Sequence, residues 1–151
     1  MNGHNGPGAY LIDSNIFLRV IVRDEEHTWK DCVDILFEIE HDTIVAFIPT
    51  VVIAEVQYVL KSFYGFEKST LIKALAGIVA TRNLEVVDDL SFPLAMKLFE
   101  DHNVKFVDSL IASSRRVQEK KAAILSYDRD FDKLGIKRVE PRDFLKKSLK
   151  K

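Results

Sequence analysis

The sequence has a single cysteine, Cys32, and therefore cannot form an intramolecular disulfide. It also lacks a long apolar run, because its most apolar stretch, residues 44–56, is interrupted by Pro49, Thr50 and Glu55. That stretch is shorter than the ~20 residues that a membrane-spanning helix needs. The N-terminus has no basic start followed by an apolar block, so no signal peptide is recognisable. We therefore expect a cytoplasmic protein with no membrane association.

Motifs of several common enzyme classes are also missing. There is no glycine-rich loop of the GxxxxGK(S/T) or GxGxxG type, which argues against a nucleotide-hydrolysing or dinucleotide-binding enzyme. The four histidines form no i, i+4 pair and have no companion cysteine motif, which argues against a zinc site. Ser14 and Ser109 lack the context of a nucleophile elbow, so covalent acyl chemistry has no support.

The charges are almost balanced in number. Lys and Arg total 22 and Asp and Glu total 23, and this formal net charge of −1 neither favours nor excludes a nucleic-acid partner. A chain of 151 residues with 47% apolar residues is large enough for one domain with a sizeable core. We therefore expect one active site, whose chemistry depends on where the charges are placed.

Apolar periodicity divides the chain into alternating strands and helices. Residues 1–8 are rich in glycine and are interpreted as a flexible leader, residues 9–145 as the folded domain, and residues 146–151 as a basic tail. The expected strands are residues 9–12, 44–47, 84–87, 123–125 and 136–139. Helical repeats cover residues 29–37, 52–63, 71–79, 94–99, 107–117 and 144–149, and Ser91 is a plausible N-cap. This alternation predicts an α/β fold in which a mostly parallel sheet of about five strands is flanked by helices on both faces.

Four acidic residues stand out against this apolar pattern. Asp13 and Asp128 lie just past the ends of expected strands, where ligands bind in parallel sheets. Glu55 lies on the apolar face of its helix, and Asp108 begins a helix between apolar neighbours. Each has a structural alternative, since Asp13 and Asp108 could cap helices and Glu55 could form a salt bridge. Two acids at two strand ends nevertheless indicate a shared site.

Four segments together resemble the PIN-domain nucleases, and among them the VapC-type toxins of prokaryotic toxin–antitoxin pairs: Leu11-Ile12-Asp13-Ser14-Asn15, Ala54-Glu55-Val56, Asp108-Ser109-Leu110-Ile111-Ala112 and Leu125-Ser126-Tyr127-Asp128-Arg129-Asp130-Phe131. No single motif is specific, but the ordered set covers nearly the whole chain. The resemblance implies a single PIN-like domain and a catalytic, metal-binding quartet of Asp13, Glu55, Asp108 and Asp128. It also implies supporting roles for Asn15, Ser126 and, less consistently within the family, Asp130.

The chemistry of such a quartet is consistent with phosphodiester hydrolysis. Clustered carboxylates are hard oxygen ligands suited to Mg²⁺ or Mn²⁺, which activate water and neutralise charge on a scissile phosphate. The resemblance implies that the substrate is single-stranded RNA. Cations near the motifs are candidates for binding its phosphates: Arg19, Lys105, Arg115, Arg116 and Arg129.

The biological role has more than one interpretation. A toxin would need an inhibitory antitoxin protein and would commonly form a homodimer. The alternatives within the same fold are an RNA-processing nuclease and a scaffold or binding module with little catalysis. A phosphohydrolase of the haloacid-dehalogenase type is disfavoured, because Asn15 stands where that chemistry requires a second aspartate.

Overall fold

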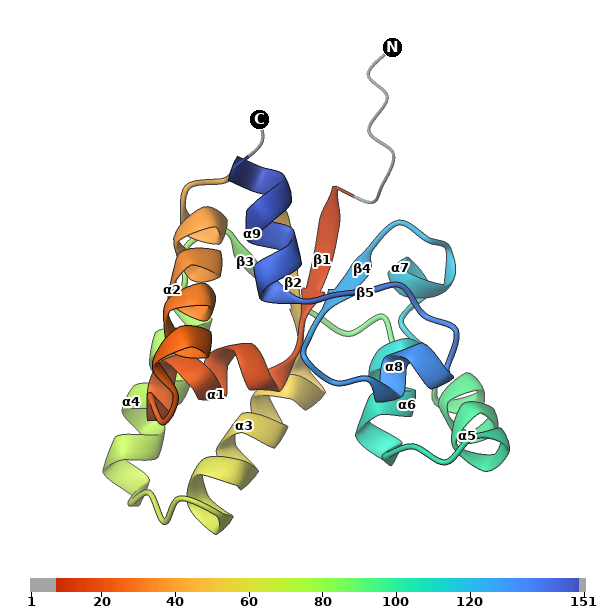
Figure 1. The fold of residues 1–151 in the computed structure, drawn as a ribbon. Coiled ribbons are helices and arrows are strands. Elements are labelled where there is room, and N and C mark those ends of the chain that lie inside the picture. The colour runs from red at the N-terminus through yellow and green to blue at the C-terminus, as the bar shows by residue number, and fades with distance from the viewer. Residues whose placement is uncertain (1–7, 150–151) are drawn as a thin grey trace.

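Five parallel strands form the centre of the fold, in the order β3-β2-β1-β4-β5 (Figure 1). The computed structural model describes residues 8–149, so most of the leader predicted at residues 1–8 and the last two lysines of the predicted tail lie outside the described residues. The strands are β1 (Ala9–Ile12), β2 (Val45–Pro49), β3 (Leu84–Val87), β4 (Ala123–Leu125) and β5 (Arg138–Val139).

The central strands are apolar on both faces. Leu11 and Ile12 of β1 and Ile124 and Leu125 of β4 are completely buried, as expected for parallel strands covered by helices on both sides. Their backbones pair in register, with Leu11 opposite Ile124 and Ile12 opposite Leu125. The residues that follow these two strands therefore start from a rigid, closely aligned pair of strand ends.

Helices cover the sheet in two groups. One group consists of α1 (Ser14–Val22), α2 (Glu26–Glu40), α3 (Thr50–Ser62), α4 (Lys68–Val79) and α9 (Pro141–Leu149). The other consists of α5 (Phe92–Asp101), α6 (Phe106–Ala112), α7 (Arg115–Gln118) and α8 (Asp130–Lys133). Helix contacts are made within each group, and the two groups lie on opposite sides of the sheet (Figure 1). This is the arrangement that right-handed crossovers produce, and it confirms the predicted fold class.

The connection order creates a switch point at the centre of the sheet. From β1 the chain adds β2 and β3 on one side, and it then returns to add β4 and β5 on the other. The direction of addition therefore reverses between β1 and β4. In open parallel sheets, the crevice beyond the carboxyl ends of the strands at such a point is the usual ligand site.

Three of the predicted strands, residues 9–12, 84–87 and 123–125, have the observed boundaries, whereas the helices begin one to three residues before the predicted apolar repeats and α1 was not among the predicted helices. The second strand extends to Pro49 because residues Ala46–Pro49 pair with the whole of β3, from Leu84 to Val87. Only Arg138 and Val139 of the predicted last strand pair with β4. Phe63, predicted to lie on a buried stripe, follows the end of α3 and is 80% exposed.

The helix predicted across residues 107–117 is interrupted at two serines. The Ser113 hydroxyl donates to the carbonyl of Leu110 at 2.6 Å and thereby competes with the helical pattern at the end of α6. Ser114 has a non-helical backbone, with φ −51° and ψ 131°, and is the N-cap that precedes α7. The prediction of one continuous helix was therefore wrong. Among the described residues, no helix is both long and apolar enough to cross a bilayer.

Candidate active site

Acidic side chains gather at the switch point of the sheet. Asp13 follows the last residue of β1 directly, and Asp128 lies three residues beyond the end of β4. The Asp13 N–H donates to the carbonyl of Leu125 at 3.2 Å, which ties the first residue after β1 to the end of β4. The two acids expected at strand ends therefore lie at the edge of the sheet where ligands are expected.

Asp13 is fixed by hydrogen bonds to both of its carboxylate oxygens. One oxygen accepts from the Ser14 N–H at 2.7 Å, and Asp13 is the N-cap of α1. The other accepts from the Ser126 hydroxyl at 2.6 Å and from the Asn15 amide at 3.3 Å. Ser126 and Asn15, the two expected supporting residues, thus lie directly against Asp13.

The electrostatic environment of Asp13 disfavours its charge. Only 3% of the residue is exposed, and this burial raises the pKa of Asp13 to about 6. The hydrogen bonds from Ser126 and Ser14 lower the pKa, while the nearby Glu55 and Asp128 carboxylates raise it further. A cation next to Asp13 would offset the free-energy cost of ionising this buried carboxyl.

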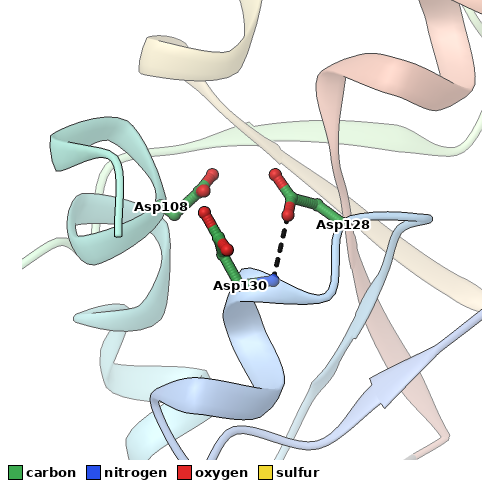
Figure 2. Close-up of side chains that lie close together, drawn as sticks. All are labelled: Asp108, Asp128 and Asp130. Atoms are coloured by element: carbon green, nitrogen blue, oxygen red, sulfur yellow. Dashed lines mark hydrogen bonds between the residues drawn. The ribbon is translucent and has the colours of Figure 1, made fainter. Parts of the chain in front are cut away.

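Three aspartates form the closest group of acids in the described part of the chain. Asp108, Asp128 and Asp130 each offer a carboxylate oxygen, and these oxygens lie within 4.8 Å of one another. Figure 2 shows the three side chains converging from α6, from the loop after β4 and from the start of α8. A hydrogen bond from the Asp130 N–H to one Asp128 oxygen, at 2.9 Å, shapes the turn that brings two of them together (Figure 2).

Asp108 is the most buried member of this group. It is 2% exposed and lies inside the first turn of α6, whose N-cap is Lys105, so Asp108 is not the helix cap. Its Oδ2 atom has no hydrogen-bond partner. Burial raises the pKa of Asp108 to about 8; Lys105 opposes this shift, and Asp128 and Asp13 add to it.

Asp128 differs from Asp108 because it has donors around it. Burial opposes its ionisation, but the Asp130 N–H and the Lys105 ammonium outweigh that effect and hold the pKa of Asp128 below its usual value. The Asp128 N–H in turn donates to the Ser126 hydroxyl at 2.9 Å. Ser126 therefore connects Asp128 to Asp13.

Glu55 approaches the site from α3 and is not a member of the three-aspartate group. It is half-buried and accepts a hydrogen bond from the Ser14 hydroxyl. Ser14 follows Asp13 in the chain, so its backbone holds one acid of the predicted quartet and its side chain holds another. Sequence reasoning gave Ser14 no role of its own.

The acid group fits a divalent cation of the Mg²⁺ or Mn²⁺ type. Carboxylate oxygens converge from three segments, and one buried oxygen of Asp108 lacks a partner. A buried carboxylate oxygen without a partner is unfavourable, and carboxylate oxygens are the ligands that hard divalent cations prefer. Asp130, expected only as an uncertain helper, contributes to this group directly.

The five cations proposed for RNA binding have different environments. Lys105 reaches the acids, with its ammonium 3.2 Å from Asp128 Oδ2. Arg19 pairs with Asp24, and Arg115 pairs with Glu119. Two more complete the set: Arg116, which pairs with Asp89 and lies over the Phe47 ring, and Arg129, which is exposed between Asp128 and Asp130.

Acids after β3 have a structural role instead. Asp89 accepts hydrogen bonds from the Ser114 hydroxyl at 2.9 Å and from the Arg116 N–H at 3.0 Å, which fixes the start of α7. Asp88 accepts from the Thr50 hydroxyl. The sequence signal that selected Asp13 and Asp128, an acid beyond a strand, applies equally to these two residues.

Arg138 holds the loop after β4 that carries two residues of the site. Sequence reasoning did not select it. Its side chain is 12% exposed and forms ion pairs with Asp132 at 3.0 Å and with Glu140 at 2.8 Å. It also donates to the backbone carbonyl of Ser126 at 3.2 Å. Its position on β5 therefore stabilises the loop that carries Ser126 and Asp128.

Comparison with known proteins identifies a family with this fold. The sequence model described as the PIN domain matches residues 10–137. Similar solved structures include VapBC2 of Rickettsia felis bound to a DNA fragment from its promoter (TM-score 0.64, 21% identity, 87% of this chain and 98% of that chain). They also include PAE2754 of Pyrobaculum aerophilum (TM-score 0.66, 12% identity, 99% and 100% of the two chains). A third is VapC20 of Mycobacterium tuberculosis, a toxin that cleaves the sarcin–ricin loop (TM-score 0.59, 14% identity, 84% and 95%). No curated protein matches the sequence.

Proposed function

The chain belongs to the PIN-domain family, and from this membership and its acid geometry we propose that it is a divalent-metal-dependent endoribonuclease hydrolysing RNA phosphodiester bonds. The observation that carries the proposal is the carboxylate of Asp108. It is buried, one of its oxygens has no hydrogen-bond partner, and it faces Asp128 and Asp130. Such an arrangement is unfavourable for an apo protein and favourable for one that binds a cation.

The residues of this chain have distinct roles in the proposal. Asp108, Asp128 and Asp130 would hold a Mg²⁺ or Mn²⁺ ion, with Asp13 and Glu55 beside them as the remaining acids of the site. The ion supplies charge neutralisation on the phosphate and activation of water.

Hydrogen bonds orient the acids before any ligand binds. Ser126 positions Asp13 and Asp128, and Ser14 positions Glu55. Such preorganisation lowers the cost of assembling the site.

We further propose that the protein is the toxin of a toxin–antitoxin pair and acts in the cytoplasm. Support comes from the similarity in fold to VapBC2, which was solved bound to a DNA fragment from its promoter, and to VapC20, a toxin that cleaves the sarcin–ricin loop. An antitoxin protein and a second copy of this chain are the partners that this role implies. Induced expression in a bacterial host should arrest growth, and Asp13→Asn should restore it; sustained growth with active wild-type enzyme would contradict the toxin assignment.

The activity itself is tested by incubating the purified protein with end-labelled single-stranded RNAs in Mg²⁺, in Mn²⁺ or in EDTA. Asp108→Asn and Asp13→Asn should each lower the cleavage rate at least about 100-fold, because they remove charge from the site. Asp89→Asn is the matched control, since it changes an acid at a neighbouring strand end that holds α7.

The outcomes separate the assignment from its alternatives. Cleavage that requires metal, disappears in the two site variants and persists in Asp89→Asn supports the proposal. Cleavage that continues in EDTA or in Asp108→Asn would point to a contaminating nuclease or to different chemistry. A protein that binds no metal and cleaves none of the RNAs would instead fit the scaffold interpretation.

A further inference from the structure

Lys105 occupies an unusual place for a lysine near a proposed metal site. It is the N-cap of α6 and lies three residues before Asp108. Its ammonium is 3.2 Å from Asp128 Oδ2 and 4.0 Å from Asp108 Oδ2. The side chain is 65% exposed, so it reaches the two acids from the solvent side.

The two carboxylate oxygens that Lys105 approaches accept no hydrogen bond from other groups of the site. Asp128 Oδ1 accepts from the Asp130 N–H, whereas its Oδ2 faces Lys105. Asp108 Oδ2 has no hydrogen-bond partner, and the ammonium at 4.0 Å is too far away to supply one. Asp108 and Asp128 are two of the three acids that would hold a divalent ion, so Lys105 and the ion would compete for the same carboxylates.

We propose that Lys105 is an internal cation that pairs with Asp128 and lies beside Asp108 in the metal-free protein, and that it is displaced when a divalent ion binds. The inference rests on the proposed function, because it takes these carboxylates as the metal site. The inference adds Lys105 as a competitor of the metal ion. This competition raises the metal concentration that is needed to fill the site.

Because Lys105 is largely exposed, little free energy is needed to displace its ammonium from the acids. An ion pair with a largely solvated lysine is weak, and the four-carbon stem of lysine lets the ammonium turn into solvent without moving the backbone. A divalent ion gains contacts to several carboxylates at once and is therefore the stronger competitor. Lys105 contributes most when no metal is bound, when the acids would otherwise repel one another.

The test is calorimetric titration of Mn²⁺ into wild-type protein and into Lys105→Gln, together with melting temperatures in EDTA and in Mn²⁺. Without the competing ammonium, Mn²⁺ should bind about two- to fivefold more tightly, the factor that corresponds to losing one exposed charge pair. Lys105→Gln should also melt lower than wild type in EDTA and show a larger rise in melting temperature with Mn²⁺. This combination of a less stable apo protein and a tighter metal site is specific to a displaced counter-ion.

Two variants act as controls. Lys105→Arg keeps the charge and should bind Mn²⁺ with nearly the wild-type Kd. Lys97→Gln removes another largely exposed lysine, which pairs with Asp101 on α5 at 3.2 Å, and should leave the Mn²⁺ affinity unchanged.

Each outcome is decisive. If the wild type binds Mn²⁺ and Lys105→Gln binds it no more tightly, the role of Lys105 is refuted while the proposed function stands. If Lys97→Gln tightens binding as much as Lys105→Gln, the effect is one of net charge, and the counter-ion role is again refuted. If the wild type binds no Mn²⁺ at all, the metal site and the role of Lys105 fail together.

Discussion

Replacing Asp108 with asparagine should stabilise the metal-free protein above neutral pH. Asp108 is 2% exposed and has one oxygen without a hydrogen-bond partner. Burial raises its pKa to about 8, against the opposing effect of Lys105. The folded protein therefore retains a proton at this carboxyl that the unfolded chain, whose carboxyl pKa is near ~4, has released.

The direction of the pH dependence follows from this difference in bound protons. Because the folded state binds the extra proton, the free energy of unfolding decreases as the pH rises above the unfolded pKa, and the decrease ends near the folded pKa of about 8. Each pH unit costs about 1.4 kcal/mol. This one carboxyl accordingly accounts for a loss of about 4 kcal/mol between about pH 5 and about pH 8.

Asp13 contributes in the same direction but over a lower range. Its pKa is raised to about 6 by burial, so its contribution is lost mainly as the pH rises to that value. Between about pH 6 and pH 8, the slope belongs chiefly to Asp108. Asparagine does not titrate, and Asp108→Asn should remove this part of the slope.

The assay is urea denaturation in EDTA at a series of pH values for wild type and for Asp108→Asn. The two curves of unfolding free energy against pH should converge near pH 5 and separate towards pH 8, with the variant more stable. Saturating Mn²⁺ at pH 8 should stabilise the wild type and have little effect on the variant. Parallel curves from pH 6 to pH 8 would refute the reasoning, because they would mean that Asp108 is ionised without cost.

Three further substitutions separate support of the site from support of the fold. Ser126→Ala removes the hydroxyl between Asp13 and Asp128 and should weaken Mn²⁺ binding about tenfold by calorimetry; an unchanged Kd would show that the acids hold their positions without it. Arg138→Met removes a largely buried guanidinium that pairs with two partly exposed acids and donates to the Ser126 carbonyl, and it should cost about 1 kcal/mol in urea denaturation; no measurable loss would mean that Arg138 does not stabilise the loop. Asp89→Asn should cost about 1 kcal/mol through the weakened start of α7 and leave the Mn²⁺ affinity unchanged, so a large loss of affinity would place Asp89 in the metal site.

The strands were predictable where burial alone determines them. The runs that become β1 and β4 are apolar at every position, and residues 9–12 and 123–125 form strands with the predicted boundaries. The ends of β2 and β5 depend on which neighbouring residues pair with them, and this is not encoded in the local pattern. The four-residue helix α8 is too short to show an apolar repeat.

The composition of the acid group was only partly predictable. An acid beyond a strand is a real signal, but it marks Asp88 and Asp89 as readily as Asp13 and Asp128. The two pairs of acids differ in their hydrogen-bond partners. Asp88 and Asp89 accept hydrogen bonds from Thr50, Ser114 and Arg116, which are distant from them in sequence. Lys105 was visible as a charge beside a motif, but its approach to Asp128 depends on the packing of α6 against the loop after β4.

Asp13 shows that a capping role and a ligand-binding role are compatible in one carboxylate. A carboxylate has two oxygens, each able to accept more than one hydrogen bond. One Asp13 oxygen caps α1, and the other faces Ser126, through which Asp13 is connected to Asp128. The cap fixes the orientation of the carboxylate, and that orientation directs the second oxygen towards the site. At the end of a central strand, the residue that begins the next helix is also the one best placed to hold a ligand, so a structural role for such an acid is no argument against a catalytic one.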